Sequence, residues 1–395
     1  MDGSGSGLQA SPARCATAVV KVASRCNLNC SYCYMYNMGD ETWRSQPALM
    51  SAATVDALIG RVAEHCRFHA LARFRFGFHG GEPLLAKPAF YRRFVGQARA
   101  RFPDGSTPLF SMQTNGVLLT PAWARLLADL GVSVGVSLDG PRAVNDRQRV
   151  DHRGRGSFDA VRRGWDSAVA AGLRPGILTV VDVEADPLET YAFLKEMAPR
   201  VVDFLLPEAN WDRPPPGAAP DLARHADWLL AVFEAWAAEP APPFRIRLFE
   251  HIVAAVVGLG GRLDALGPSL NEVLVIETDG AIEPVDVLRA CRSGITRTPR
   301  NVRTDSLDAA LGDEMADLYH HSNRRLCAVC DGCRVKAVCA GGYLSHRFSE
   351  ARGFENPSVY CRDLLKLISR IQAWTVDALP AEVVDATGLV ALEPA

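Results

Sequence analysis

Short β-type runs alternate with helical patterns through the first half of the chain, and this alternation restricts the fold more than any other feature. Six runs read as strands, at residues 18–23, 73–79, 109–114, 132–137, 175–181 and 201–206. Each has the length of a strand buried in a parallel sheet. Because right-handed crossovers curl such a sheet, the sequence predicts an α/β protein with a partial (β/α)6 TIM-like barrel. A ligand site is then expected where the strands end.

Helical spacing of apolar residues places the helices between these strands. Val55, Leu58, Ile59 and Val62 recur at that spacing behind Ser51, which suits an N-cap. We expect the apolar face of this helix to pack on the sheet.

A proline-rich segment at 213–217 ends the barrel pattern. Two helical stretches follow it, and then a hairpin pattern at 273–285 that turns at Asp279-Gly280. A cysteine-rich segment occupies 327–361. We therefore predict a flexible tail (1–16), a barrel core (17–212), a linker with bridging helices (213–270), a small cysteine-rich α+β domain (271–370) and a C-terminal extension (371–395).

Charge and hydropathy exclude two classes of partner. Lys and Arg number 43 against 45 Asp and Glu, without a long block of either sign, so we expect no nucleic acid. The longest apolar stretch, 252–259, is too short to cross a bilayer, and the first residues lack an export signal. The expected location is the cytoplasm, where the 11 cysteines are better interpreted as ligands than as disulfides.

Cys26, Cys30 and Cys33 follow the first predicted strand as a CxxxCxxC run. Three thiolates can hold three irons of a [4Fe–4S] cluster and leave the fourth iron free for S-adenosylmethionine (SAM). A zinc site is the alternative, but structural zinc prefers four ligands in paired CxxC units, and no fourth Cys or His lies nearby. The triplet is therefore predicted to be catalytic.

This triplet, with Tyr32 before its third cysteine, resembles the signature of the radical SAM superfamily. Gly80-Gly81-Glu82 resembles that family's SAM-binding motif, and polar residues end the next strands. What the resemblance implies is a set of cofactor-binding residues, namely Tyr32, Gly80, Gly81, Glu82, Asn115, Ser137 and Arg149. Among these, Asn115 and Ser137 would contact the ribose and carboxylate of SAM, and Arg149 would pair with the carboxylate. Each residue alone also suits a turn or a strand-end cap.

The cysteines of the segment 327–361 form a second set, with enough thiolates to bind another iron–sulfur cluster. Their spacing would suit a structural zinc ion equally well. Cys330, Cys333, Cys339 and Cys361 resemble, with the same gaps, the auxiliary-cluster ligands of the SPASM domain. The resemblance thus implies at least one auxiliary [4Fe–4S] cluster. Sulfatase-maturing enzymes of this kind carry two, but Tyr343 stands here at a position where they have cysteine. Cys291 and Cys327 are left as spare thiols, either ligands of an incomplete cluster or buried side chains.

Four short sequence segments resemble those of maturases that form three-residue cyclophanes in ribosomally made peptides, namely residues 20–26, 34–37, 43–47 and 353–361. The resemblance implies a precursor-peptide substrate, an external one-electron reductant, and a C–C cross-link between an aromatic residue and a nearby β-carbon. Oxidation of Cys or Ser, thioether formation and epimerisation stay open, as does a non-enzymatic zinc scaffold. A leader peptide is expected to dock by strand addition at the hairpin of 273–285.

Overall fold

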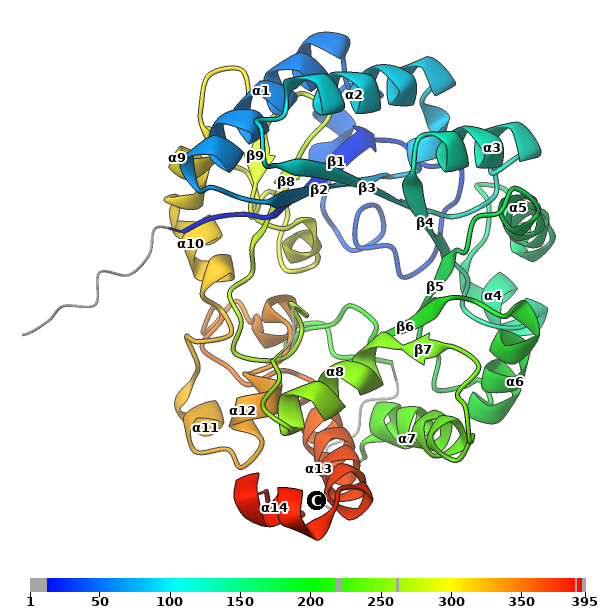
Figure 1. Cartoon of the computed structure of the whole chain (residues 1–395), viewed down its shortest axis with the longest axis vertical. Helices are drawn as coiled ribbons and strands as arrows, with labels where there is room; N and C mark the ends of the chain where they lie inside the picture. Colours follow the sequence, from blue (N-terminus) through cyan, green and yellow to red (C-terminus); the bar gives the residue numbers. More distant parts are fainter. Residues whose placement is uncertain (1–12, 217–221, 261–262, 388, 393–395) are drawn as a thin grey trace, which may run out of the picture.

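The computed structural model describes residues 13–216, 222–260, 263–387 and 389–392. Its centre is a nine-stranded sheet in the order β7-β6-β5-β4-β3-β2-β1-β8-β9, which curls into an open barrel (Figure 1). The strands are β1 (Thr17–Ala23), β2 (Arg73–Gly80), β3 (Thr107–Thr114), β4 (Val132–Ser137), β5 (Gly176–Val180), β6 (Val201–Leu205), β7 (Arg245–Ile246), β8 (Val273–Ile276) and β9 (Ile282–Glu283). All six predicted strands are present as β1 to β6, each parallel to the next, so the predicted α/β partial barrel is confirmed.

Helices cover the outer face of the barrel (Figure 1). Those that follow the strands are α1 (Ala52–Phe68), α2 (Pro88–Arg101), α3 (Pro121–Asp129), α4 (Arg142–Gln148), α5 (Phe158–Ala170), α6 (Pro187–Met197) and α7 (Arg224–Ala237). Ser51 caps α1 as predicted, because its side chain accepts a hydrogen bond from the Thr54 N–H. Val55, Leu58, Ile59 and Val62 are buried on the face of α1 toward the sheet.

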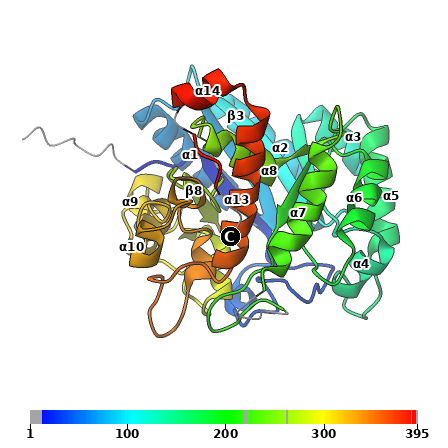
Figure 2. The ribbon, with the colours of Figure 1, turned by 90° about the horizontal axis from the view of Figure 1, so that it is seen from below.

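The C-terminal part of the chain continues with shorter helices. They are α8 (Arg247–Val256), α9 (Leu307–Leu311), α10 (Glu314–His320), α11 (Ala328–Asp331), α12 (Lys336–Cys339), α13 (Cys361–Ala378) and α14 (Ala381–Thr387). Figure 2 shows α13 lying along α7. The rings of Phe233 in α7 and Trp374 in α13 pack edge to face, with their centroids 5.4 Å apart. The end of the chain therefore packs against the barrel, with buried residues of α13 in the same apolar core.

The hairpin β8–β9 belongs to the barrel sheet. Val273 and Ile276 of β8 pair in parallel with Thr17 and Val20 of β1, whose edge would otherwise be free. We predicted this hairpin as the start of a separate domain. The predicted boundaries at 212 and 270 stay predictions, but the hairpin itself extends the sheet of the core.

The outer edge of β9 is already occupied. The Ile282 N–H donates to the Arg300 carbonyl, and the Thr298 hydroxyl donates to the Ile282 carbonyl. Both polar groups that an added strand would use at Ile282 are thus satisfied within the chain. Docking of a leader peptide by strand addition there, as we expected, would require the segment around Arg300 to move away.

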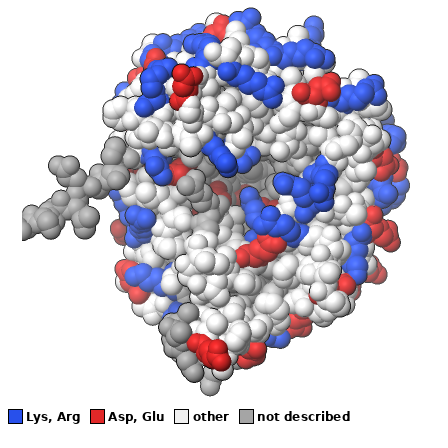
Figure 3. Space-filling view, in the orientation of Figure 1, with Lys and Arg blue, Asp and Glu red and all other residues white. Residues whose placement is uncertain are grey.

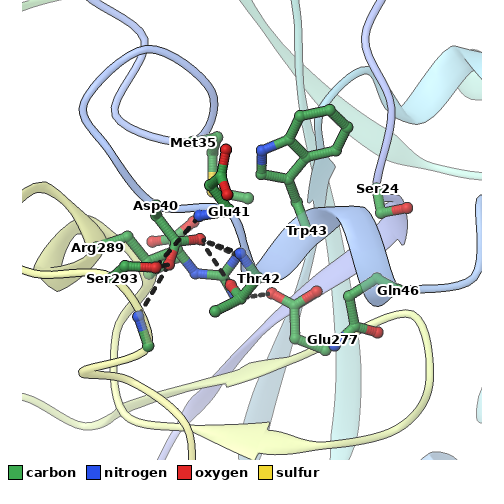
Figure 4. A network of polar contacts seen from close by, with 12 residues as sticks. Ser24, Met35, Asp40, Glu41, Thr42, Trp43, Gln46, Glu277, Arg289 and Ser293 are labelled. Atoms are coloured by element: carbon green, nitrogen blue, oxygen red, sulfur yellow. Dashed lines mark hydrogen bonds and ion pairs between the residues drawn. The ribbon is translucent and has the colours of Figure 1, made fainter.

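A buried charge network ties the hairpin to the loop that follows the first cysteine triplet (Figure 4). Arg289 is 0% exposed, and its Nη2 donates to Glu277 Oε1 and Glu283 Oε2, each at 2.7 Å. Its Nη1 lies 3.6 Å from Asp40 Oδ2. Asp40 in turn accepts a hydrogen bond from the Gly294 N–H. One guanidinium therefore joins residues that are far apart in sequence.

The ends of the chain bear on two predictions. Most of the predicted flexible tail, residues 1–12, lies outside the described residues, as do 388 and 393–395 of the predicted C-terminal extension. Cys15 of that tail is fully buried in the core, so the tail as predicted extends too far. Within the described ranges, no helix combines the length and apolarity needed to span a membrane.

Candidate active site

A cavity of about 390 Å³ opens where β1 to β6 end. Its lining includes all three cysteines of the first triplet and, from the cysteine-rich segment, Tyr343 and His346. The site at the carboxyl ends of the strands was expected from the fold. In Figure 3, Lys and Arg side chains lie around a hollow near the middle of the face shown.

The loop that carries Cys26, Cys30 and Cys33 is held by backbone hydrogen bonds. The Asn29 N–H donates to the Val150 carbonyl at 2.7 Å, and the Ser31 N–H donates to Gln148 at 3.0 Å. These bonds fix the loop against the C-terminal end of α4. The three thiols thereby reach one cavity from a single short segment.

The thiols suit an iron–sulfur cluster better than a single zinc ion. Zinc bound by thiolates at about 2.3 Å would bring the sulfur atoms within roughly 4 Å of one another. Across the described residues, the one metal-ligand group whose atoms all lie within 4.8 Å contains no cysteine. Burial raises the pKa of Cys26 to about 12 and that of Cys33 to about 11, so a metal must displace the protons.

Gly80 and Gly81 allow the end of β2 to approach the cysteine loop. A Cβ on Gly80, whose φ is +144°, would lie 2.2 Å from the Ala23 carbonyl oxygen. A Cβ on Gly81 would lie 2.2 Å from the Arg25 carbonyl oxygen and 2.1 Å from Tyr36 Oη. Both glycines line the cavity, and their place beside a cofactor stays a prediction.

Glu82 is placed differently from the other predicted cofactor-binding residues. It is 0% exposed and absent from the cavity lining. Its carboxylate accepts hydrogen bonds from the Leu84 N–H, the Asn115 N–H and the Thr114 hydroxyl. The Glu82 carboxylate therefore does not line the cavity, whereas the motif predicts a contact with SAM through its exposed backbone, and that contact stays a prediction. The carboxylate instead fastens the end of β3 to the end of β2.

Tyr32, Asp139 and Arg149 form a buried chain of hydrogen bonds in the cavity wall. Arg149 Nη1 donates to Tyr32 Oη at 2.7 Å, and Tyr32 Oη donates to Asp139 Oδ2 at 2.6 Å. Arg149 Nε is buried with no hydrogen-bond partner among the described residues. Burial acts against its charge, but Tyr32, Cys30 and Asp139 outweigh this and raise the pKa of Arg149. Arg149, which lines the cavity, is therefore a permanent cation with one unused donor.

The other two predicted residues also line the cavity. Asn115 Nδ2 donates to Asn27 Oδ1 at 2.8 Å and approaches Cys26 Sγ at 3.6 Å. Ser137 Oγ accepts a hydrogen bond from Gln113 Nε2 at 2.9 Å. The structure thus brings the predicted strand-end residues to one wall, beside the cysteine loop.

Sequence reasoning missed an ionic group that contributes Asp286 and His79 to the cavity lining. Asp286 forms a buried ion pair with Lys21 and accepts a hydrogen bond from Tyr34 Oη at 2.9 Å. His79 Nδ1 lies 3.1 Å from Lys21 Nζ. Burial alone would raise the pKa of Asp286, but Lys21 and His79 hold it below its usual range. The missed signal was an acidic residue directly after a predicted hairpin.

Glu208, which follows β6, is a second carboxyl group that the sequence did not single out. It lines the cavity and accepts a hydrogen bond from Ser345 Oγ at 2.8 Å. Burial raises the pKa of Glu208 to about 8. At neutral pH this carboxyl group therefore holds a proton, in contrast to Asp286.

We expect the stability of the protein to depend on pH through Glu208. Its folded pKa of about 8 exceeds the unfolded value of about 4.3, so the folded state binds the extra proton and wild-type stability falls as pH rises between them. Gln cannot ionise. The free energy of unfolding of Glu208→Gln, relative to that of wild type, should therefore increase by about 1.4 kcal/mol for each unit of pH up to about pH 8. Anaerobic thermal unfolding from pH 5 to 9 measures this. A difference in stability between Glu208→Gln and wild type that does not change with pH would contradict this prediction. Glu64→Gln is the control, because Glu64 is an exposed residue of α1.

The second cysteine set also converges, at a smaller pocket. Cys330, Cys333, Cys339 and Cys361 all line it. Burial, and then the adjacent Cys327 thiol, raises the pKa of Cys330 to about 12. Of the two spare thiols, Cys327 is thus adjacent to Cys330, whereas Cys291 Sγ lies 3.7 Å from the Ser345 carbonyl oxygen.

A buried arginine shapes the loop between these cysteines. Arg347 donates to the carbonyls of Ala340, Gly341 and Gly342, all three of which have positive φ. A Cβ on Gly341 would lie 2.7 Å from this guanidinium, so the close approach requires glycine there. The turn directs the chain away from Cys339 and leaves its thiol at the pocket.

The sequence is similar to a known family model and to characterised enzymes. Residues 20–194 match the model of the radical SAM superfamily. The chain is 28% identical over 345 residues to a serine-type anaerobic sulfatase-maturating enzyme of Klebsiella aerogenes, covering 82% of this chain and 78% of that protein. It is 23% identical over 354 residues to a cysteine-type enzyme of Clostridium novyi, with 86% and 90% covered.

Solved structures share the fold at low sequence identity. Native anSMEcpe with bound AdoMet superposes with a TM-score of 0.80 at 20% identity, covering 95% of this chain and 100% of that chain. The same protein with AdoMet and the Kp18Cys peptide gives 0.79 at 20% identity, with 95% and 99% covered. Streptococcus suis SuiB bound to the precursor peptide SuiA gives 0.58 at 15% identity, with 88% and 76% covered.

Proposed function

Because residues 20–194 match the model of the radical SAM superfamily, we propose that the protein matures a ribosomally made precursor peptide by joining an aromatic residue to a nearby β-carbon. It is a radical SAM enzyme that acts on a peptide or protein substrate. The cross-link is the part that we propose.

One observation carries the proposal: a single cavity has a polar wall for a cofactor and an apolar wall for a side chain. The polar wall holds the cysteine triplet and Arg149. Leu178, Leu205, Leu248 and other aliphatic residues line the rest. An aromatic side chain of the peptide would be desolvated there, next to the strand ends.

The residues present fit the cofactors that the fold implies. Cys26, Cys30 and Cys33 would hold a [4Fe–4S] cluster, and Cys330, Cys333, Cys339 and Cys361 an auxiliary one. Arg149 Nε would bind the carboxylate of SAM, with Asn115 and Ser137 near the ribose and the backbone of Gly80 and Gly81 near the amino group. When bound, SAM and the first cluster supply a 5′-deoxyadenosyl radical that takes a hydrogen atom, and the auxiliary cluster supplies an electron acceptor or structural support.

Asp286 is an ionised carboxylate of the cavity lining that would pass on, rather than hold, the proton that cross-linking releases, because its low pKa makes it a weak base. Joining a β-carbon to a ring removes two hydrogens. One would leave as a hydrogen atom to the SAM-derived 5′-deoxyadenosyl radical, giving 5′-deoxyadenosine; the other would leave as a proton, with its electron going to the auxiliary cluster. Asp286 lines the cavity and stays ionised beside Lys21. Tyr34 Oη fixes the orientation of its carboxylate. Glu208, protonated at neutral pH, cannot take that proton.

Co-expression tests the proposal. The protein is produced anaerobically with each short open reading frame that adjoins its gene, and the peptides are examined by tandem mass spectrometry. We expect loss of two hydrogen atoms and no fragmentation between the joined residues. An unchanged peptide in every case, while purified enzyme with dithionite cleaves SAM, would contradict the cross-link.

Oxidation of Cys or Ser to an aldehyde is the second candidate, because the chain resembles both types of sulfatase-maturating enzyme over most of its length. Ser oxidation also removes two hydrogens, so mass alone does not separate the two reactions. An aldehyde reacts with a hydrazide probe, and a cyclophane does not. Labelling of the product by hydrazide would therefore favour oxidation over the cross-link.

A further inference from the structure

Two histidines and an aspartate meet on the side of the barrel away from the cavity lining. His65 lies in the last turn of α1 and His69 is the C-cap of that helix, while Asp308 lies at the start of α9. His69 Nε2 is 2.6 Å from Asp308 Oδ1, and His65 Nδ1 is 3.1 Å from Asp308 Oδ2. The three ligand atoms all lie within 4.8 Å of one another.

The second nitrogen of His65 is oriented by the backbone. His65 Nε2 lies 3.1 Å from the Cys15 carbonyl oxygen and 3.2 Å from the Cys15 backbone nitrogen. In one tautomer Nε2 donates to the carbonyl and Nδ1 presents its lone pair toward Asp308; in the other Nε2 accepts from the Cys15 N–H and Nδ1 donates to Asp308. A metal ion on Nδ1 requires the first tautomer. Metal-binding histidines are commonly fixed in this way by a carbonyl on the other ring nitrogen. The His65 side chain is 0% exposed, so its orientation is held by packing.

We propose that His65 Nδ1, His69 Nε2 and the Asp308 carboxylate bind a divalent cation of the zinc class. Imidazole and carboxylate ligands suit zinc, which takes such groups at about 2.0–2.2 Å. The Asp308 side chain is 37% exposed, so solvent completes the coordination. None of the three residues lines the cavity, so the ion is structural.

Such an ion would join two parts of the chain. It links α1 of the barrel to α9, which follows the β8–β9 hairpin, and through His65 it reaches the entry to β1 at Cys15. The site is independent of the proposed peptide chemistry. It shares no residue with either cysteine set.

Zinc binding to the intact protein tests the assignment. The full chain, with its clusters reconstituted anaerobically, is titrated with Zn²⁺ against a competing chelator, and zinc and iron are measured in the same sample. We expect wild type to retain one zinc per chain, with only nitrogen and oxygen neighbours in zinc K-edge X-ray absorption. His69→Gln and Asp308→Asn should weaken binding by more than the roughly 10- to 100-fold that loss of an outer-shell partner causes.

A matched control lies at the C-terminal end of α10. His321 Nδ1, at the C-cap, pairs with Asp317 Oδ1 at 2.9 Å without a third ligand group among the described residues, so His321→Gln should bind zinc as wild type does. Unchanged iron content shows that the variants have folded. The assignment fails if wild type retains no zinc, if the bound zinc has sulfur neighbours only, or if His69→Gln and Asp308→Asn bind as tightly as wild type. In that case the three residues form a hydrogen-bonded group without a metal.

Discussion

Changing Cys26, Cys30 and Cys33 together to alanine is expected to abolish cleavage of SAM. The three thiols face one cavity from one loop, and without them no ligand remains for the first cluster. Iron should fall from about eight to about four atoms per chain, because the second cysteine set is separate. Anaerobic reconstitution, iron and sulfide analysis, and chromatography of 5′-deoxyadenosine formed with dithionite measure both effects.

Cys66→Ala is the matched control, since Cys66 is a buried cysteine of α1 outside the cavity lining. It should keep wild-type iron and SAM cleavage. Formation of 5′-deoxyadenosine by the triple variant would show that the cavity we describe is not where the reaction begins. An iron content of about eight in the triple variant would show that these thiols hold no cluster.

Replacing Arg289 with methionine is expected to lower the free energy of unfolding by roughly 3–5 kcal/mol. The guanidinium is fully buried and contacts the carboxylates of Glu277, Glu283 and Asp40 (Figure 4). Methionine fills much of the space but leaves these carboxylates without their cation. Urea unfolding of the anaerobic protein measures the loss.

The same substitution should show a particular pH dependence. Burial already raises the pKa of Glu277 to about 7 with Arg289 present, and loss of the cation raises it further. The folded variant can then take up protons at acidic pH, so the loss of stability should be smaller at pH 5 than at pH 8. Arg297→Met is the control, because Arg297 is exposed and donates only to Thr42 and Ser45. Equal losses for Arg289→Met and Arg297→Met would contradict the account.

The parallel part of the fold could be predicted because its physical signals are local. Each strand of β1 to β6 is a short β-type run, and α1 has one apolar face behind its cap, Ser51. The pairing of β8 with β1 could not be predicted in the same way. A hairpin has the same alternation whether it starts a domain or extends a sheet, and the partner edge lies more than 250 residues away in sequence by the register Thr17 to Val273.

The site was predictable where residue type decides the chemistry and less so where placement decides it. The cysteine triplet, Asn115, Ser137 and Arg149 all reach the cavity. Glu82 does not, because its carboxylate is used by backbone N–H groups of the neighbouring strand end. Asp286 and Glu208 are single carboxyl groups after a hairpin and a strand, and only burial beside different neighbours gives one a low pKa and the other a high one.

The central claim is that this cavity brings a peptide carbon to the radical chemistry of SAM, and isotope transfer tests it most directly. A fully deuterated precursor peptide is incubated with the reconstituted enzyme, unlabelled SAM and dithionite. The account predicts 5′-deoxyadenosine that carries one deuterium, together with a peptide that has lost two. If the 5′-deoxyadenosine contains no deuterium while the peptide is bound, the hydrogen atom comes from elsewhere and the claim is contradicted.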